Sequence, residues 1–423
     1  MLQVLGVVLF LVGLMISIGL HELGHMLPAK KFGVRVSEYF VGFGPTLWSR
    51  HGKETEYGIK AIPLGGYVKL VGMIPPEEAV KPVRSRGRVG RIIADARDAS
   101  VDEVRDGEDF RAFYHLTWWR KVIIMFGGPF VNLVLAIAIF TTVLVGIGTP
   151  TATTTVDAVA TCVPAAGQVE CAAGDPPSPA SEVGLQAGDT ITAVNGAPVG
   201  SWVDLTTVIA ASPGVALELT VDRGGETVEV LVTPASRVRA TASGGTETVG
   251  YLGVTPTSEV VTQGLGAGVA LAWDYTVATA KVIFTLPVQI YHAFMATIGA
   301  EERSSTSVMG IVGVGRISGD IVAADVEGYS PLYKLADFLM LLGGLNLALF
   351  AFNMIPLVPL DGGHIASALW QGIKNGWARL RGLPRPRPVD VARMMPLAYG
   401  VFGVLIVMGA VLILADIFAP IEV

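Results

Sequence analysis

Four runs of apolar residues dominate the pattern of hydrophobic and polar positions along the chain. Each is long enough to supply the roughly 20 helical residues that cross about 30 Å of hydrocarbon. They cover residues 1–28, 121–147, 335–358 and 397–418. The first run carries no basic residue before Lys30 and no small-residue cleavage pattern, so we interpret it as a retained span. The pattern therefore predicts a polytopic α-helical membrane protein with about four transmembrane helices.

A fifth apolar run, residues 264–298, leaves two alternatives open. It is long enough to cross a bilayer, but Asp274, Lys281 and His292 interrupt it. A fifth span would also place the basic loop that follows on the outer side. We therefore expect an amphipathic helix on the extracytoplasmic surface of the membrane, within an extracytoplasmic helical region over residues 258–334.

Composition and charge agree with a membrane protein and give it an orientation. Of the 423 residues, 51% are hydrophobic and only 16% are charged, against about 25% in soluble domains. Residues 28–121 hold 17 Lys and Arg, whereas residues 148–336 hold 7 against 18 Asp and Glu. Because cytoplasmic loops are rich in Lys and Arg, residues 29–120 and the basic loop 359–396 are predicted to be cytoplasmic. Both termini are then extracytoplasmic, and the expected surroundings are a lipid bilayer, with no nucleic-acid partner.

The cytoplasmic segment after the first run begins with short strand patterns. Tyr57 and Ile59 alternate with polar or small neighbours, and Gly65-Gly66 marks a turn or bulge before Tyr67. These residues predict a small membrane-associated β element on the cytoplasmic side. Residues 76–117 are charged and rich in turn formers, and are predicted to form a loop.

Residues 150–257 read as one β-rich domain inserted between the second and third spans. The segment "ALELTVDRGGETVEVLVTP" predicts a hairpin that turns at Arg223-Gly224-Gly225. The run "GLQAGDTITAVNG", residues 184–196, resembles a PDZ domain, a class that binds peptides or chain ends by strand addition. Cys162 and Cys171 precede this run, and either a disulfide or two free thiols is compatible with the sequence.

The motif HELGH, residues 21–25, lies at the end of the first apolar run. On a helix, His21 and His25 share one face and can bind one zinc ion, while Glu22 beside them can act as a general base. A purely structural polar cluster is the alternative. Unpaired His and Glu inside a membrane are costly, which favours the metal site.

A hydrolytic zinc site needs a third protein ligand and an open position. "FNMIPLVPLDGGH", residues 352–364, offers Asp361 where Pro356 and Pro359 break the third span. Irregular backbone at such a place is expected only where it is shielded or lines a cavity. The sequence alone leaves a turn or helix cap as an equal alternative for Asp361.

Taken together, HExxH in the first span, Asn353-x-x-Pro356 with Leu360-Asp361-Gly362 in the third, and a PDZ-like domain between them resemble a site-2 protease. The resemblance implies that His21, His25 and Asp361 bind one Zn²⁺ and that Glu22 is the general base and acid. It also identifies the membrane as the bacterial inner membrane.

Two residues near the third ligand keep alternative roles. Asn353 could donate a hydrogen bond to the developing oxyanion or could cap the broken helix. His364 could support the metal ligands from behind or be merely a residue of the cytoplasmic end, and we favour the latter.

The family resemblance implies a zinc-dependent intramembrane endopeptidase that cuts single-span membrane proteins after an earlier cleavage. Anti-sigma factors and signal-peptide remnants are the implied substrate classes. The segment containing Tyr57, Ile59, Gly65, Gly66 and Tyr67 is the candidate strand for binding an unwound substrate, with a purely buttressing hairpin as its alternative. The rival functions are a catalytically silent PDZ scaffold and a zinc transporter, for which we find no internal repeat.

Two further features concern helix geometry. Gly127 and Gly128 in "FGGPFVN" are predicted to allow close helix packing, and Asn132 to hydrogen-bond to a neighbouring helix. Pro28 removes a helical hydrogen bond to the Gly24 carbonyl, so the first helix is predicted to end or kink just past His25.

Overall fold

The chain forms two compact units, which are described separately. The computed structural model describes residues 1–80, 87–105, 107–164, 171–172, 174–240, 246–304, 307–325 and 329–421. The helical unit comprises Met1–Ile147 and Gly264–Val423, and the β unit comprises Gly148–Gln263.

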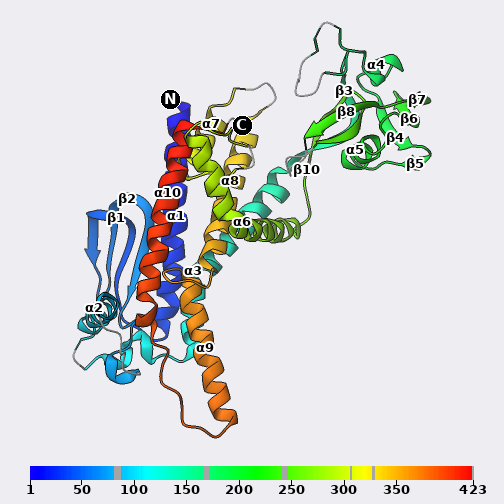
Figure 1. Cartoon of the computed structure of the whole chain (residues 1–423). Helices are drawn as coiled ribbons and strands as arrows, with labels where there is room; N and C mark the ends of the chain where they lie inside the picture. The colour runs from blue at the N-terminus through cyan, green and yellow to red at the C-terminus, as the bar shows by residue number, and fades with distance from the viewer. Residues whose placement is uncertain are drawn as a thin grey trace. The chain divides into compact units, whose positions relative to one another are not determined.

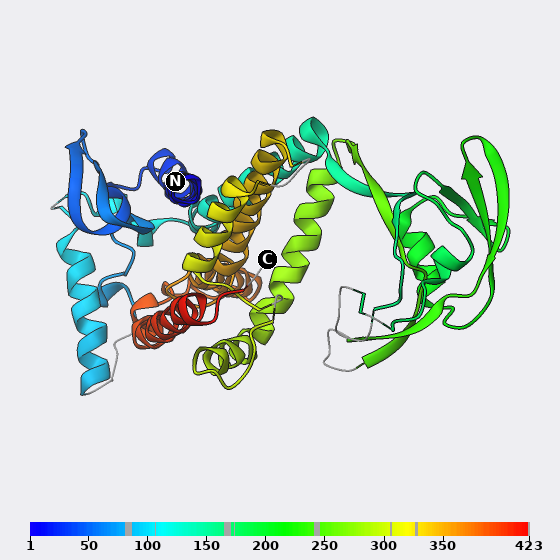
Figure 2. The same cartoon turned by 90° about the horizontal axis from the view of Figure 1, so that it is seen from above.

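Long helices build most of the helical unit, and Figures 1 and 2 show them packed around one another. Their bounds are α1 Leu2–Lys31, α2 Arg88–Asp102, α3 Trp118–Thr141, α6 Ala267–Thr297, α7 Ile311–Ala323, α8 Pro331–Asn353, α9 Asp361–Leu380 and α10 Met395–Phe418. A π-helical turn, Thr142–Ile147, extends α3. Short 3₁₀ turns cover Glu77–Ala79, Asp109–Arg111, Phe113–His115 and Val391–Met394.

Within the described ranges, five helical segments are long and apolar enough to cross a membrane. They are Leu2–Lys31, Trp118–Ile147, Ala267–Thr297, Pro331–Asn353 and Val391–Phe418. Four of them correspond to the four predicted spans. The additional one is α6, which has the lowest mean hydropathy of the five at 1.3. Length and composition therefore allow α6 to be a fifth span as well as a surface helix.

Helix α1 continues past His25 to Lys31, so the predicted end just past His25 is wrong. Pro28 lies inside the helix and leaves the Gly24 carbonyl without its usual donor. That carbonyl instead faces Gly127 of α3 so closely that a Cβ on Gly127 would lie 2.0 Å from its oxygen. A close helix crossing of this kind allows Cα–H···O contacts, which compensate in part for the lost hydrogen bond.

A small sheet of β1 (Val36–His51) and β2 (Glu56–Leu70) packs beside α1. Each of the two long strands contributes two segments to the sheet. Side by side, the four segments lie in the order 66–70, 36–41, 56–60 and 46–51, so β1 and β2 alternate across the sheet. Tyr39 ties the sheet to α1, because its hydroxyl donates to the Gly19 carbonyl at 2.6 Å. Segment 66–70 is therefore an edge of the sheet, held next to α1.

The charged segment that was predicted to be a loop contains α2. Residues 81–86 and 106 of that segment lie outside the described ranges. The helix buries Ile93 and Arg97, one turn apart, and Arg97 pairs with Asp390 at 2.9 Å. The high charge of the segment hides its amphipathic pattern, and the partner of Arg97 lies nearly 300 residues away in sequence.

In the β unit, a sheet and helix α5 enclose one hydrophobic core. The elements are β3 Thr149–Val159, α4 Pro179–Glu182, β4 Thr190–Val194, β5 Ala197–Pro198, α5 Trp202–Ala210, β6 Leu217–Arg223, β7 Glu226–Val232, β8 Ala235–Ala240, β9 Thr246–Tyr251 and β10 Val254–Val261. The main sheet has the order β10-β3-β4-β6-β7, and β8 pairs with β9. The β6–β7 hairpin that was predicted from the sequence is confirmed. The core is built from alternate strand residues such as Leu217, Leu219 and Val221.

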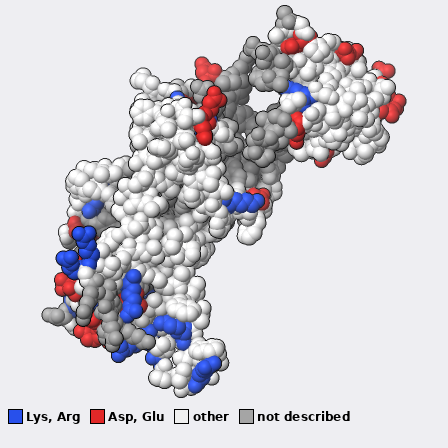
Figure 3. All heavy atoms as spheres, viewed as in Figure 1, with Lys and Arg blue, Asp and Glu red and all other residues white. Residues whose placement is uncertain are grey.

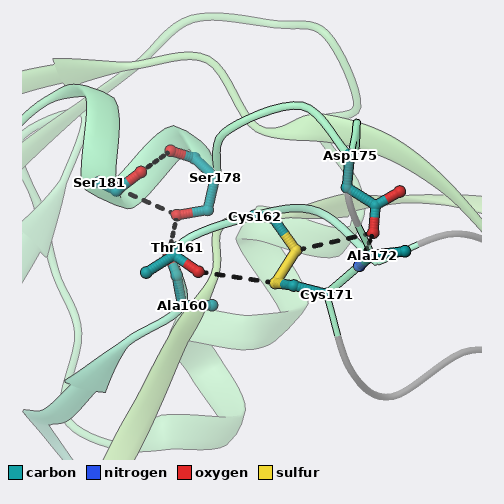
Figure 4. The surroundings of a disulfide bond; sticks show 8 residues. All are labelled: Ala160, Thr161, Cys162, Cys171, Ala172, Asp175, Ser178 and Ser181. Atoms are coloured by element: carbon teal, nitrogen blue, oxygen red, sulfur yellow. Dashed lines mark hydrogen bonds between the residues drawn. A yellow bond between two sulfur atoms is a disulfide. The ribbon is translucent and has the colours of Figure 1, made fainter.

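The structure joins Cys162 and Cys171 by a disulfide at the margin of the β unit (Figure 4). The backbone N–H of Ala172 donates to the Asp175 carboxylate at 2.8 Å, which fixes the turn after the second cysteine. Residues 165–170 between the cysteines lie outside the described ranges.

Candidate active site

The site forms where α1 crosses α3 at backbone contact. A Cβ on Gly24 would lie 2.4 Å from the Gly127 carbonyl oxygen, so neither helix has room for a side chain at this point. A Cβ on Gly128 would lie 2.3 Å from His25 Nε2 and 2.8 Å from His21 Cε1. The predicted role of the two glycines in close packing is confirmed. Gly128 additionally leaves the space that the two imidazole rings occupy.

Three ligand atoms converge at this crossing. His21 Nε2 and His25 Nε2 are 3.2 Å apart, and Asp361 Oδ2 lies 3.3 and 3.2 Å from them. A tetrahedral ion with ligand distances of about 2.0–2.1 Å has ligand–ligand edges of about 3.3 Å. Asp361 Oδ2 is also buried and accepts no hydrogen bond. The donor set and its spacing therefore fit one zinc ion.

The other ring nitrogen of each histidine has a partner that orients it. His21 Nδ1 lies 3.0 Å from Asn132 Oδ1, and His25 Nδ1 lies 2.8 Å from the Ile124 carbonyl oxygen. Both partners are acceptors, so Nδ1 carries the proton and Nε2 presents its lone pair to the site. Asn132 is fully buried on α3, and His25 is 3% exposed. Helix α3 therefore holds both rings in the tautomer that a metal requires.

Asp361 reaches the histidines because the chain folds back between α8 and α9. Helix α8 ends at Asn353, and α9 begins at Asp361 itself. A Cβ on Gly362 would lie 2.2 Å from the Ile355 carbonyl oxygen, and one on Gly363 would lie 2.5 Å from the Val358 nitrogen. The two glycines thus let the connecting loop pack directly on the first turn of α9, which places the carboxylate inside the helical unit.

A cavity of about 520 Å³ opens onto these residues. Polar groups of the site share its wall with apolar side chains from α1, the small sheet, α3 and α8. The apolar lining includes Ile18, Phe43, Val68, Leu70, Met73, Met125, Leu349, Pro359 and Leu360. Glu22 faces the same cavity and is 8% exposed. The cavity therefore brings a buried carboxylate and the ligand triad to one apolar space.

The edge segment of the sheet forms one wall of this cavity. Gly65, Gly66 and Tyr67 line it, and a Cβ on Gly66 would lie 3.2 Å from Glu22 Cγ. Tyr57 and Ile59 do not, because each pairs with strand neighbours on both sides. The candidate substrate strand thus divides into an edge part at the site and an interior part of the sheet.

Two residues after the third span also line the cavity. Asn353 Nδ2 donates to the Leu349 carbonyl at 3.0 Å, within its own helix, while the side chain borders the cavity. His364 was interpreted as a cytoplasmic-end residue, but it lines the cavity one turn after Asp361. The predicted hydrogen bond of Asn132 to a neighbouring helix is confirmed, with His21 as its partner, whereas the role of the Ile124 carbonyl was not predicted. The polar Asn132 in an apolar run was the signal for the former.

Comparison with known proteins identifies relatives along the whole chain. The sequence pattern of peptidase family M50 matches residues 9–382. The zinc metalloprotease Rip1 of Mycobacterium tuberculosis (strain Erdman) is 33% identical over 438 residues, covering 100% of this chain and 99% of the relative. Metalloprotease MmpA of Caulobacter vibrioides is 28% identical, covering 86% and 85% of the two chains. Zinc metalloprotease RasP of Oceanobacillus iheyensis is 25% identical, covering 85% and 88%.

Proposed function

The chain belongs to peptidase family M50 and is a zinc metalloprotease, and from this premise we propose that it cleaves transmembrane segments of other membrane proteins. The observation that carries the proposal is the position of the ligand triad between apolar helices, beside an apolar cavity. Such a site accepts a peptide that leaves a membrane more readily than one that arrives from water. We further propose single-span proteins that were cut once before, including anti-sigma factors and signal-peptide remnants, as the substrates.

His21, His25 and Asp361 hold the zinc ion in this proposal, since their three ligand atoms have the spacing of a tetrahedral site. When bound, zinc polarises the scissile carbonyl and makes a water molecule more acidic. Asn132 and the Ile124 carbonyl keep the two imidazoles in place throughout the reaction. Two neutral imidazoles and one carboxylate leave the ion with a net positive charge, which suits the stabilisation of an oxyanion.

Glu22 moves the proton in the proposed reaction. Its carboxylate lies beside the ligand histidines in the shared cavity, with Val68 backbone in hydrogen-bond reach. It accepts a proton from the attacking water and later donates that proton to the leaving amine nitrogen. The low exposure of Glu22 keeps bulk water away from this transfer. Asn353 lines the same cavity, and we propose that it donates a hydrogen bond to the developing oxyanion.

The edge segment 66–70 is the proposed docking strand for substrate. A helical peptide bond is shielded by its own hydrogen bonds, so the substrate must unwind before cleavage. An unwound segment can add to a free sheet edge through backbone hydrogen bonds. Gly66 supports this, because the absence of a side chain lets the edge pack directly on Ile18 and Glu22 of α1, so that an added segment would lie near Glu22. Tyr67 next to it stacks on Phe40 and Phe43, which stiffens the strand.

The proposed topology keeps the small sheet and α9 on the cytoplasmic side of the bacterial inner membrane and both termini outside. The β unit is then an extracytoplasmic PDZ-like domain. A cavity of about 530 Å³ lies between α5 and the β9–β10 segment, lined by Trp202, Ile209, Tyr251 and Val254 among others. A peptide or chain end is its proposed ligand, through which the domain selects or filters substrates.

The experiment that tests the function is cleavage of a single-span reporter by the purified chain in detergent. Wild type and Glu22→Gln are compared, and bound zinc is measured in both. We expect cleavage only by wild type, with equal zinc content in the two proteins. Equal cleavage by both variants would refute the role of Glu22. Absence of cleavage by either protein, with zinc bound and several reporters tried, would favour a catalytically silent scaffold.

A further inference from the structure

The end of α9 exposes an apolar stripe. Ile373, Trp377 and Leu380 lie at positions i, i+4 and i+7, and they are 62, 57 and 85% exposed. Residues at this spacing share one face of a helix. Leu383, just after the helix, continues the stripe and is 56% exposed. An apolar face of this kind in water is unfavourable and indicates a surface that something covers.

The sequence segment that carries this stripe is basic. Residues 362–389 contain one Lys and four Arg, at 374, 379, 381, 385 and 387, and no Asp or Glu. Arg381 stacks over the Trp377 ring at 4.4 Å, which joins the charge to the stripe. Arg385 lies close enough to Lys121 of α3 for the two charges to repel each other. Figure 3 shows Lys and Arg gathered at this end of the helical unit.

Packing against α3 places the segment at a membrane boundary. A Cβ on Gly372 would lie 2.7 Å from the Trp118 ring, so α9 passes Trp118 at this residue. Trp118 and Trp119 begin an apolar span and are followed by Arg120 and Lys121, an arrangement typical of the interface between hydrocarbon and water. Residues after Gly372 therefore project from the span at head-group level, where α9 extends from the unit (Figure 1).

We propose that residues 373–387 bind the anionic phospholipid head groups of the surrounding bilayer. The stripe lies against the head-group layer, and the guanidinium groups bind lipid phosphates. Three observations select this occupant: the Trp, Ile and Leu stripe beside basic residues, the lack of Asp and Glu in the sequence of residues 362–389, and direct continuity with a membrane-spanning unit. Because α9 begins at Asp361, anionic lipid also anchors the helix that carries one zinc ligand.

The test uses the full chain in nanodiscs and an environment-sensitive fluorophore at Leu383→Cys. The two native cysteines are paired, so the new thiol is the one to label. We expect the emission to shift to the blue when part of a neutral phosphatidylcholine bilayer is replaced by phosphatidylglycerol, and the shift to diminish with added salt.

The triple variant Arg379→Gln, Arg381→Gln and Arg385→Gln is the perturbation. Each basic residue near an anionic surface favours association with it about fivefold. Association of the segment with phosphatidylglycerol should therefore be on the order of 100-fold weaker in the variant, and the blue shift should be lost. The matched control exchanges three exposed basic residues elsewhere on the predicted cytoplasmic side, Arg50, Lys53 and Arg88, for Gln.

Three results would overturn the proposal. The emission could be the same in neutral and anionic bilayers, which means that anionic lipid does not cover the stripe. The control variant could lose the shift as fully as the α9 variant, which means that the effect depends on net charge alone. A shift that follows protein concentration in neutral bilayers would assign the stripe to a second copy of the chain.

Discussion

Replacement of Asn132 by Leu tests the geometry of the metal site most directly. The two side chains are similar in size, so the exchange leaves packing nearly intact. It removes the Oδ1 acceptor that lies 3.0 Å from His21 Nδ1. Within the described ranges Asn132 Nδ2 has no hydrogen-bond partner, so the contact with His21 is the interaction that the variant loses. The cost therefore falls on the orientation of His21.

The magnitude follows from burial. His21 is 9% exposed and Asn132 is fully buried, so water does not readily replace the lost acceptor. An unsatisfied buried donor costs about 1–3 kcal/mol. That range is about 5- to 150-fold in zinc affinity, similar to the 10- to 100-fold seen when outer partners of metal ligands are removed. We expect a zinc affinity reduced by about 10- to 100-fold for Asn132→Leu, and restored by Asn132→Asp.

The assay is competition for zinc between the detergent-solubilised protein and a chelator of known affinity. The absorption spectrum of the Co²⁺ form gives a second readout, because a rotated imidazole changes the ligand field. Asn346→Leu is the matched control: Asn346 is 1% exposed and donates to Ser17 Oγ at 2.9 Å, one turn before His21. Unchanged affinity in Asn132→Leu, or equal loss in both variants, would refute the reasoning.

Three further predictions concern packing and charge. Gly127→Ala should lower the unfolding free energy by about 1–3 kcal/mol and reduce zinc content, because its Cβ would lie 2.0 Å from a backbone oxygen; thermal unfolding and metal analysis measure both. Asp416→Asn should destabilise the helical unit by about 3–5 kcal/mol, since it removes the carboxylate charge that pairs at 2.9 Å with Arg303, which is 2% exposed. Arg303→Lys serves as a milder comparison in the same unfolding assay. The Arg223 guanidinium lowers the pKa of Asp189, so this carboxylate stabilises the β unit above about pH 4 and loses its effect as the pH falls through the lowered pKa. In hydrogen exchange of the full chain, the amides of the β unit should be less protected in Asp189→Asn than in wild type at pH 7. At low pH the two proteins should be equally protected.

Sequence patterns predicted the structure correctly where the residues involved are close together in the sequence. The HELGH run on an apolar helix predicted that His21 and His25 are neighbours on one helix face. The β6–β7 hairpin followed from alternation around Gly224-Gly225. In each case the relevant residues lie within a few positions of one another, so helix or strand geometry alone relates them.

Contacts between distant segments were not predictable in the same way. The continuation of α1 past Pro28 depends on the close approach of Gly127, and α2 depends on the pairing of Arg97 with Asp390. The sheet places segment 36–41 between 56–60 and 66–70, which no alternation pattern reveals. Tertiary contacts decided these features against the local preference.

The proposed zinc ligands come from opposite ends of the chain, which has a consequence for biosynthesis. His21 and His25 emerge early, whereas Asp361 is translated more than 330 residues later. At about 5–20 residues per second, this interval lasts roughly 20 to 70 s. Throughout that time the nascent chain lies in the membrane, among other newly inserted helices, without a complete ligand set. With the proposed ligand set, the protease is expected to be inert until Asp361 has been inserted, so that a truncated product of interrupted translation would not cleave its neighbours.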